Sequence, residues 1–133
     1  MKPKLTRLAT FVAGMSWLLA AAPASAHHSF NAEYDASKPL KLTGTVTKVE
    51  WKNPHVLVHL DAKDQDGSVR AWLLEARAVS IMRRLGFEQD FVKAGDAVTL
   101  SVCVAKDGSH TGGLESIESP AGTKRVGECV VPQ

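Results

Sequence analysis

Residues 40–61 carry the stretch LKLTGTVTKVEWKNPHVLVHLD, and its pattern of apolar residues decides the fold class. Apolar and polar side chains alternate from Leu40, which is typical of a β-strand with one buried face. The alternation changes phase near Thr47-Lys48, and a β-bulge there would reconcile the two halves. Lys52-Asn53-Pro54 then interrupts the strand, and alternation resumes over 55–61. The stretch therefore predicts two strands, the first of them bent.

Downstream of this stretch, the chain predicts three more strands and one short helix. Residues 64–67 (DQDG) have hairpin chemistry, because Asp and Gly tolerate positive φ, and they lead into a returning strand over 69–75. Further strands are predicted at 97–104 and, more weakly, at 113–118. Between the third and fourth strands, apolar residues recur at helical spacing before a glycine that can end the helix. These residues are Ala78, Ile81, Met82 and Leu85, and the glycine is Gly86.

The order β-β-β-α-β-β predicts an all-β protein with one short helix, folded as a small five-stranded OB-like barrel over residues 40–133. Another five-stranded meander or half-barrel with a packed helix is the alternative. Residues 27–39 show no period, so we expect them to form an extended or loosely ordered arm. The prediction is thus one domain preceded by an arm.

The first 26 residues have the anatomy of a cleaved secretory signal peptide. Positive charges precede an apolar run over 11–22 that is too short to span a bilayer, and the box Ala24-Ser25-Ala26 follows. We therefore expect a chain that begins at His27 and works in the periplasm or as a secreted protein. An uncleaved membrane anchor is the alternative.

Loss of this segment changes the charge of the protein. Three of the 16 Lys and Arg lie in it and none of the 14 Asp and Glu, so the remaining 107 of 133 residues carry 13 positive against 14 negative side chains. A net charge of −1 offers no basic field for nucleic acid or anionic lipid. We expect no nucleic-acid partner, and no membrane contact after cleavage.

The two cysteines, Cys103 and Cys129, are predicted to form a disulfide, because pairing is the default in an oxidising compartment. Closing a loop of this length stabilises the fold by about 3.5 kcal/mol in the chain-entropy model. Two free thiols or a soft metal site are the alternatives.

Four segments carry a resemblance to a known family. They are Ala26-His27-His28-Ser29-Phe30, GTVTKVEWKNPH at 44–55, RRLGF at 83–87 and KAGD at 93–96. They resemble a family of small exported bacterial proteins of unknown function, which pairs an A-H-H-S-F start with a V-E-W-x-N-P-H motif. The resemblance implies a periplasmic address and a small β-barrel, with no established activity. In topology the chain is also similar to bacterial OB-fold exported proteins linked to envelope stress.

An N-terminal histidine is a chelating group for copper or zinc. Its α-amine, whose unperturbed pKa is near 8, and its own ring nitrogen can bind one ion, and a second imidazole completes a set similar to the histidine brace of exported copper proteins. On the OB interpretation, two histidines lie in loops that flank the ligand face, within reach of a 13-residue arm. The candidate metal ligands are therefore His27, His28, His55 and His110.

The remaining histidine, His59, is an unsuitable partner for His55. Four residues along one strand separate their Cα atoms by roughly 13 Å, too far for two ligands of one ion. The other histidines also have a simpler interpretation, as a solvated chain start and exposed or turn-bonding loop residues.

Three further residues are candidates for a ligand face: Trp51, Asn53 and Trp72. The two indoles could form a platform for an organic ligand, or they could be core or rim residues. The chain has no G-x-S-x-G elbow, H-E-x-x-H helix or phosphate loop, so we expect no enzymatic activity. The sequence favours a periplasmic binding module with Cu(II) or Zn(II) as its ligand. The alternative is a metal-free module, with envelope stress as one setting, whose partner is an unidentified periplasmic protein or small molecule.

Overall fold

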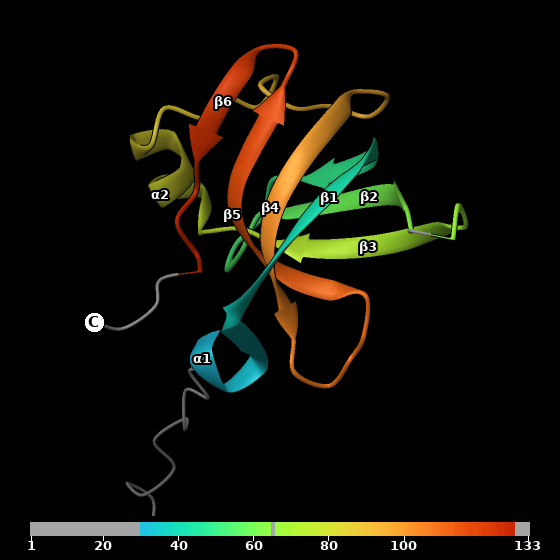
Figure 1. Ribbon diagram of the computed structural model, residues 1–133. Helices are drawn as coiled ribbons and strands as arrows, with labels where there is room; N and C mark the ends of the chain where they lie inside the picture. Colours follow the sequence, from blue (N-terminus) through green and yellow to red (C-terminus); the bar gives the residue numbers. More distant parts are fainter. Residues whose placement is uncertain (1–29, 65, 130–133) are drawn as a thin grey trace, which may run out of the picture.

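The computed structural model describes residues 30–64 and 66–129, and its elements follow the predicted order (Figure 1). The prediction of an all-β chain with a short helix between the third and fourth strands is confirmed. A one-turn helix at the start and a sixth strand at the end are additions. The elements are α1 (Phe30–Glu33), β1 (Tyr34–Glu50), β2 (Leu57–Lys63), β3 (Val69–Glu75), α2 (Val79–Arg84), β4 (Ala97–Ala105), β5 (Thr111–Ser119) and β6 (Gly122–Arg125).

The first five strands form a closed ring. The sheet order is β3-β2-β1-β4-β5-β6, and β3 also pairs with β5, which joins the two sides of the sheet. This closing pair is parallel and places Leu73 beside Thr111 and Glu75 beside Gly113, whereas the other pairs are antiparallel. We call the place where the end of β3 meets the start of β5 the β3–β5 junction.

Strand β1 is shared between two neighbours, and Gly44 marks the changeover. Gly44 pairs with Ala62 of β2 on one side and with Val98 of β4 on the other. A Cβ at this position would lie 2.1 Å from the carbonyl oxygen of Asp61, so only glycine fits. The predicted bulge is confirmed, because the register with β2 shifts between Val46 and Lys48.

The first strand begins at Tyr34, six residues before the alternation that starts at Leu40. Residues 35–41 pair with β4 or pass beside it but bury no side chain fully, so they carry no apolar period. In the part of the expected arm that the structure describes, a helical turn at Phe30–Glu33 precedes the extended start of β1 at Tyr34. Residues 27–29 lie outside the described part of the chain.

The core fills the ring, and a second, smaller cluster surrounds the predicted disulfide. Leu74, Leu100 and Leu114 are fully buried inside the ring. The Cys103–Cys129 disulfide is present, with a Cα–Cα distance of 5.8 Å, and packs with Tyr34, Ala105 and Phe30. Helix α2 contributes Met82 to the main core and ends before Gly86, whose φ of +82° suits glycine. In residues 30–64 and 66–129, neither helix has the length and hydrophobicity needed to cross a membrane.

Candidate functional site

His55 lies directly before β2, with its ring against the end of β3. Its Nδ1 is 3.0 Å from the carbonyl oxygen of Ala76 and 3.1 Å from Oε1 of Glu75. A carbonyl oxygen only accepts hydrogen bonds, so we assign the proton of the neutral ring to Nδ1 and the lone pair to Nε2. The side chain is 42% exposed. Within residues 30–64 and 66–129 no group bonds Nε2, so His55 presents a free ligand nitrogen.

The backbone around His55 fixes its position. The amide of Val56 donates to the carbonyl of Arg77, and the amide of Ala76 donates to the carbonyl of Val56. These two bonds, of 3.0 and 2.8 Å, extend the β2–β3 pairing by one step beyond the strand ends. The loop that carries His55 is therefore held to the residues that bond its ring.

Glu75 has a neighbour at each of its carboxylate oxygens. The Tyr34 hydroxyl donates to Oε2 at 3.1 Å, while Oε1 faces Nδ1 of His55. Tyr34 is 5% exposed. Burial first, and then the charge of Glu75, raise the pKa of Tyr34 above its ordinary value. The phenol therefore keeps its proton and acts as a donor throughout the neutral range.

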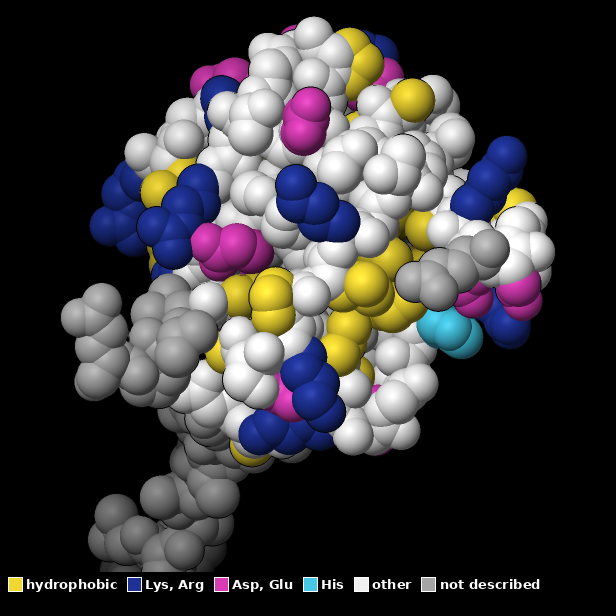
Figure 2. Space-filling view, in the orientation of Figure 1, with side chains coloured by type: hydrophobic (Ala, Val, Ile, Leu, Met, Phe, Trp, Pro, Cys, Tyr) yellow, Lys and Arg dark blue, Asp and Glu magenta, His cyan; other side chains and the backbone are white. Residues whose placement is uncertain are grey.

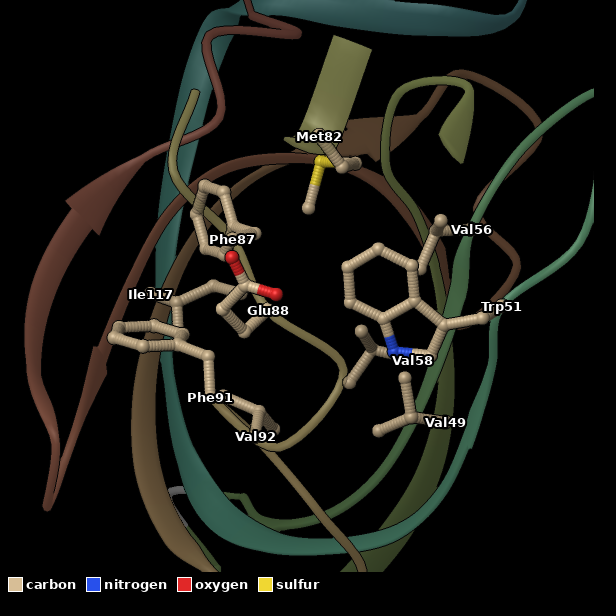
Figure 3. A pocket seen from close by; sticks show the side chains of 10 residues that line it. All are labelled: Val49, Trp51, Val56, Val58, Met82, Phe87, Glu88, Phe91, Val92 and Ile117. Atoms are coloured by element: carbon tan, nitrogen blue, oxygen red, sulfur yellow. The ribbon is translucent and has the colours of Figure 1, made fainter. Parts of the chain in front are cut away.

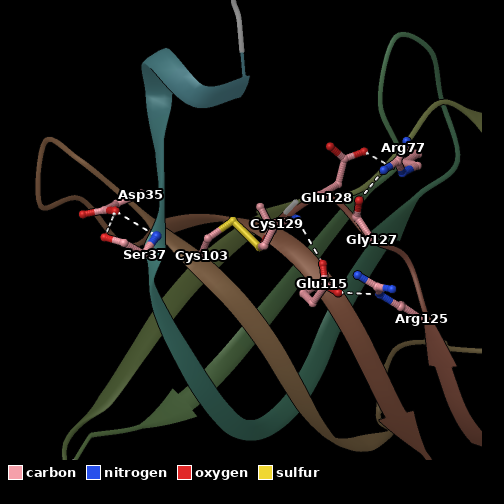
Figure 4. The surroundings of a disulfide bond; sticks show 10 residues. Asp35, Ser37, Arg77, Cys103, Glu115, Arg125, Gly127, Glu128 and Cys129 are labelled. Atoms are coloured by element: carbon pink, nitrogen blue, oxygen red, sulfur yellow. Dashed lines mark hydrogen bonds and ion pairs between the residues drawn. A yellow bond between two sulfur atoms is a disulfide. The ribbon is translucent and has the colours of Figure 1, made fainter. Parts of the chain in front are cut away.

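Arg77 and Glu128 form a second acid–base pair (Figure 4), and the charges of His55 and Glu75 both act on Glu128. The Arg77 Nε is 3.4 Å from Glu128 Oε1 and donates to the carbonyl of Val126, and another guanidinium N–H donates to the carbonyl of Gly127. Burial raises the pKa of Glu128, while the charge of Arg77 opposes that rise. The segment before Cys129 is thus tied to the residue that follows Ala76.

The disulfide and Glu115 complete this side of the molecule. Glu115 accepts from the Cys129 amide at 3.0 Å and from Arg125 Nε at 2.6 Å, and Figure 4 shows the carboxylate between the two donors. Because Cys129 is also bonded to Cys103, the segment is fixed by a covalent bond and by charged hydrogen bonds.

The first described residues pack onto the same junction. The rings of Phe30 and Tyr34 have centroids 4.7 Å apart. A Cβ on Gly113 would lie 2.1 Å from Cζ of Phe30, so the lack of a side chain at 113 is what allows Phe30 to pack on β5. Contacts therefore run from Phe30 through Tyr34 and Glu75 to His55.

The structure does not bring His110 to this place. The His110 carbonyl accepts from the Leu73 amide at 3.0 Å, and its ring meets Trp72 edge-on at 5.1 Å. Leu73 and Ala76 are three residues apart along the chain, or about 10 Å. His55 and His110 therefore flank different parts of β3.

His59 is engaged in a pair of its own. Its Nε2 lies 2.7 Å from Oε1 of Glu50 on the neighbouring strand. Lys48 and Lys52 also reach that carboxylate, at 3.4 and 3.0 Å. The hydrogen bond from His59, followed by that from Lys52, lowers the pKa of Glu50 to about 2.

Two of the predicted metal ligands, His27 and His28, lie outside the described residues. Within the described ranges 30–64 and 66–129, no three His, Cys, Asp or Glu side chains are close enough together to hold a metal ion. A metal at His55 would therefore need a ligand from outside these ranges.

The three candidates for a ligand face have different positions. Trp72 is 7% exposed and belongs to the core, which agrees with the core alternative. Asn53 accepts from the Val79 amide at 3.3 Å and so joins its loop to the start of α2. Trp51 lines an apolar cavity, opposite Phe87 and Phe91 (Figure 3).

This cavity is small. Its volume is about 10 Å³, whereas sites for small organic molecules begin at roughly 300 Å³. The indole N–H of Trp51 is buried and has no hydrogen-bond partner among the described residues, and the Glu88 carboxylate points into the same space (Figure 3). The cavity is therefore a small gap in the packing, lined by apolar side chains with the Trp51 N–H and the Glu88 carboxylate as its polar groups. In this conformation it does not admit an organic ligand.

Exposed hydrophobic side chains lie on β3 and β1, and Figure 2 shows hydrophobic side chains gathered on one face of the molecule. Val69 is 59% exposed and Leu73 is 36% exposed, and Leu40 of β1 is 38% exposed. An open groove beside Leu40 is bordered by two lysines and two aspartates, so its charge is mixed. The bordering charged residues are Lys41, Lys63, Asp64 and Asp66.

Tyr34, Glu75, Arg77 and Glu128 were not among the residues that sequence analysis selected. Their contacts join positions 41 residues apart, for Tyr34 and Glu75, and about 50 apart, for Arg77 and Gly127. No local spacing signals such pairs. The V-E-W-x-N-P-H motif does mark the loop that carries His55.

Comparison with known proteins gives a family and no activity. The model described as "Family of unknown function (DUF6152)" matches residues 16–115, a range that includes His55, Glu75 and His110 and ends before Cys129. No curated protein and no solved structure matches the chain significantly. Because the family match extends over most of the sequence, the chain belongs to the DUF6152 family of unknown function.

Proposed function

We propose that this protein is an exported, non-enzymatic binding module that holds one Cu(II) ion, or Zn(II), between His27 and His55. In this proposal, the signal peptide is removed after Ala26 in the periplasm, and His27 supplies its α-amine and its ring nitrogen. His55 supplies Nε2. Amine and imidazole nitrogens suit copper, and the deprotonated amine is accessible near neutral pH.

The observation that carries the proposal is the state of the His55 ring. Its Nδ1 is hydrogen-bonded to the Ala76 carbonyl and lies 3.1 Å from Oε1 of Glu75, while the side chain stays 42% exposed. Metal-binding histidines commonly donate their second N–H to a carbonyl or carboxylate in this way.

The position of Phe30 supports His27 as the partner. Phe30 packs on Tyr34, whose hydroxyl donates to Glu75, and Oε1 of Glu75 lies 3.1 Å from Nδ1 of His55. Three peptide units separate His27 from Phe30, so their Cα atoms are at most about 11 Å apart in any conformation. His110, at the other part of β3, is the less favoured partner.

The Cys103–Cys129 disulfide is compatible with an oxidising compartment. It agrees with the proposed export.

The test is calorimetric titration of Cu(II) and Zn(II) into protein that begins at His27. A matched variant carries one additional Ala before His27, which removes the terminal chelate and leaves every side chain in place. We expect one Cu(II) per chain and an affinity lower by about 100-fold or more in the variant, because linked ligands bind as one unit. Equal affinities would refute the chelate.

A protein-interaction module is the second candidate, favoured by the exposed Val69 and Leu73 on β3. Its discriminating outcome is the absence of stoichiometric metal binding, together with loss of a partner when Val69 and Leu73 are changed to Ser.

A further inference from the structure

We propose that the first half of β1 is a docking edge for an extended, acidic segment of a partner protein, which adds to the sheet as a further strand beside residues 39–43. This inference goes beyond the metal site and does not depend on it. It rests on a strand edge that the ring leaves unpaired, and on the groove and the charges at that edge.

Strand β1 has neighbouring strands on both edges only at Gly44 and Thr45. The ladder with β2 ends at Gly44, whereas the ladder with β4 continues back through Thr43 to Pro39. Residues 39–43 are therefore paired with β4 alone. Their other edge lies where β2 turns into the β2–β3 hairpin, and Figure 1 shows this hairpin extending away from the first half of β1.

The backbone of Lys41 directs its N–H and C=O groups to this open edge. Along an antiparallel strand, successive residues direct these groups to opposite sides. Val46 directs them toward β4, because its amide donates to Asp96 at 2.9 Å and its carbonyl accepts from Gly95 at 2.8 Å, the two residues before β4. Lys41 is an odd number of residues away, with no register shift between, so it faces the other side. Within residues 30–64 and 66–129, no backbone group bonds it there.

Pro39 is independent evidence that this edge is open. Proline has no N–H, so within a sheet it occupies positions where that N–H would face away from a neighbouring strand. Pro39 is two residues before Lys41 and therefore faces the same edge. Its carbonyl remains available, so an added strand would find acceptors at Pro39 and Lys41 and a donor at Lys41.

A groove of about 450 Å³ lies at this edge. Leu40 and Leu42 share one face of β1 and Lys41 is on the opposite face, yet all three line the groove. Side chains from both faces of a strand meet in one groove only along the edge of that strand. Leu40 is 38% exposed, so the groove also has an apolar wall. Its volume is in the range of ligand-binding sites.

The charges that line the groove favour an acidic partner. The Asp64 carboxylate is paired with Arg70 at 3.0 Å, and Asp66 accepts two hydrogen bonds from within the hairpin. In contrast, Lys41 and Lys63 have no ion-pair partner among the described residues. Two unpaired ammonium groups beside an open edge are complementary to carboxylate side chains on the added strand.

A second copy of this chain is a poorer occupant of the edge. Antiparallel pairing of two copies with full overlap of residues 39–43 would place one Lys41 opposite the other, and like charges directly opposite destabilise a pair of strands. Each copy would also bring Pro39, which has no donor. The edge is therefore better suited to a different, acidic strand.

The test measures peptide binding by fluorescence anisotropy in metal-free buffer, with protein that begins at His27. The probe is the capped peptide TVEVEVT, which is long enough to cover the roughly 16 Å of residues 39–43 and places its Glu side chains on one face. The control peptide is TVKVKVT. We expect TVEVEVT to bind at least about 10-fold more tightly than TVKVKVT, because only its charges complement the two lysines.

Matched substitutions locate the site. Lys41→Glu should weaken TVEVEVT binding by about 10-fold, since it reverses a charge at the edge. Lys93→Glu makes the same change at an exposed lysine that does not line the groove, and it should leave the affinity unchanged.

Amide hydrogen exchange tests the edge itself. In the free protein, we expect the amide of Lys41 to exchange quickly and those of Leu40 and Leu42, which face β4, to exchange slowly. Saturation with TVEVEVT should slow exchange at Lys41 by about 10-fold or more, because its N–H then donates to the added strand.

Each contrary result overturns the proposal. Protection of Lys41 in the free monomer would show that the edge is closed. Absent binding, or equal binding of the two peptides, would refute an acidic strand. A dimer in analytical ultracentrifugation with Lys41 protected would assign the edge to a second copy. None of these results bears on the Cu(II) titration, so the two proposals fail separately.

Discussion

Two histidines that lie four residues apart, His55 and His59, each lie close to a glutamate, and they differ in which ring nitrogen is hydrogen-bonded. His55 uses Nδ1 for the Ala76 carbonyl, with Glu75 Oε1 3.1 Å away, whereas His59 uses Nε2 for Glu50. The first carboxylate is held by a buried tyrosine, and the second by two exposed lysines. Both pairs therefore consist of a histidine and a glutamate, but the ring nitrogen without a hydrogen bond among the described residues is Nε2 in His55 and Nδ1 in His59.

The largest expected effect concerns the Cys103–Cys129 disulfide, which packs with Tyr34 near the first pair. The His59–Glu50 pair has no disulfide beside it in the described residues. Changing Cys103 and Cys129 together to Ser should lower the free energy of unfolding by about 3.5 kcal/mol, because the unfolded chain regains the entropy of the closed loop. Urea denaturation measures this loss. Hydrogen exchange should increase more at the Cys129 amide, which bonds Glu115, than at the β1–β2 ladder near His59. A loss below about 1 kcal/mol would show that the disulfide adds little to the native contacts.

The next effect tests the free nitrogen directly. His55→Ala should weaken Cu(II) binding by about 100-fold, or about 2.8 kcal/mol, in protein that begins at His27. His59→Ala, the matched control, should leave the affinity unchanged. Calorimetry of both variants is the measurement. Equal losses would remove the distinction between the two pairs, and a loss only in His110→Ala would move the site to the other part of β3.

A smaller effect on the free energy of unfolding is expected when the donor to each carboxylate, Tyr34 for Glu75 or Lys52 for Glu50, is removed. Tyr34→Phe removes a buried donor to Glu75 and should lower the free energy of unfolding by about 1.5 kcal/mol. Lys52→Met removes an exposed donor to Glu50 and should have little effect, since exposed ion pairs contribute little. Chemical denaturation at pH 7 compares them. Equal losses would contradict the view that burial makes the first pair the firmer one.

The smallest expected effect is the pH dependence of the free energy of unfolding. Glu50 and Glu128 should contribute to it with opposite signs. The pKa of Glu50 is lowered to about 2 in the folded protein. Its contribution to stability is therefore present above the unfolded pKa near 4.5 and is lost as the pH falls toward 2. The pKa of Glu128, near His55, is raised by burial. Its contribution is present below the unfolded pKa and is lost as the pH rises through the folded pKa.

Unfolding of Glu50→Gln and Glu128→Gln, measured between pH 2 and pH 7, checks these signs. The stability of the wild type relative to Glu50→Gln should fall on acidification, and relative to Glu128→Gln it should rise. Slopes of the same sign would show that one carboxylate is in a different environment.

Much of the fold follows from local pattern, and the exceptions have physical causes. The bulge near Lys48 is readable because Val46 and Val49 must both reach the core. Strand β6 has the sequence Gly-Thr-Lys-Arg and buries none of its residues, so it has no apolar signal to read. It forms because β5 offers a free edge.

The candidate site is less predictable than the fold. The motif around Asn53-Pro54-His55 marks the loop, but the free nitrogen of His55 depends on the Ala76 carbonyl, 21 residues away. Such contacts form only when the pairing of β3 with β5 closes the ring of strands. Trp72 shows the converse, because a residue type suited to ligand stacking is used for the core.

The pairing of β1 with β4 also has a mechanical consequence. The described chain enters β1 at Tyr34, and the ladder with β4 runs from Tyr34 to Thr45. Interstrand hydrogen bonds lie perpendicular to the strands, so tension applied to the N-terminal end along β1 loads the whole ladder in shear and does not open it one bond at a time. Whatever is attached at that end, an ion or another protein, is anchored to a strand whose ladder resists such a pull in shear.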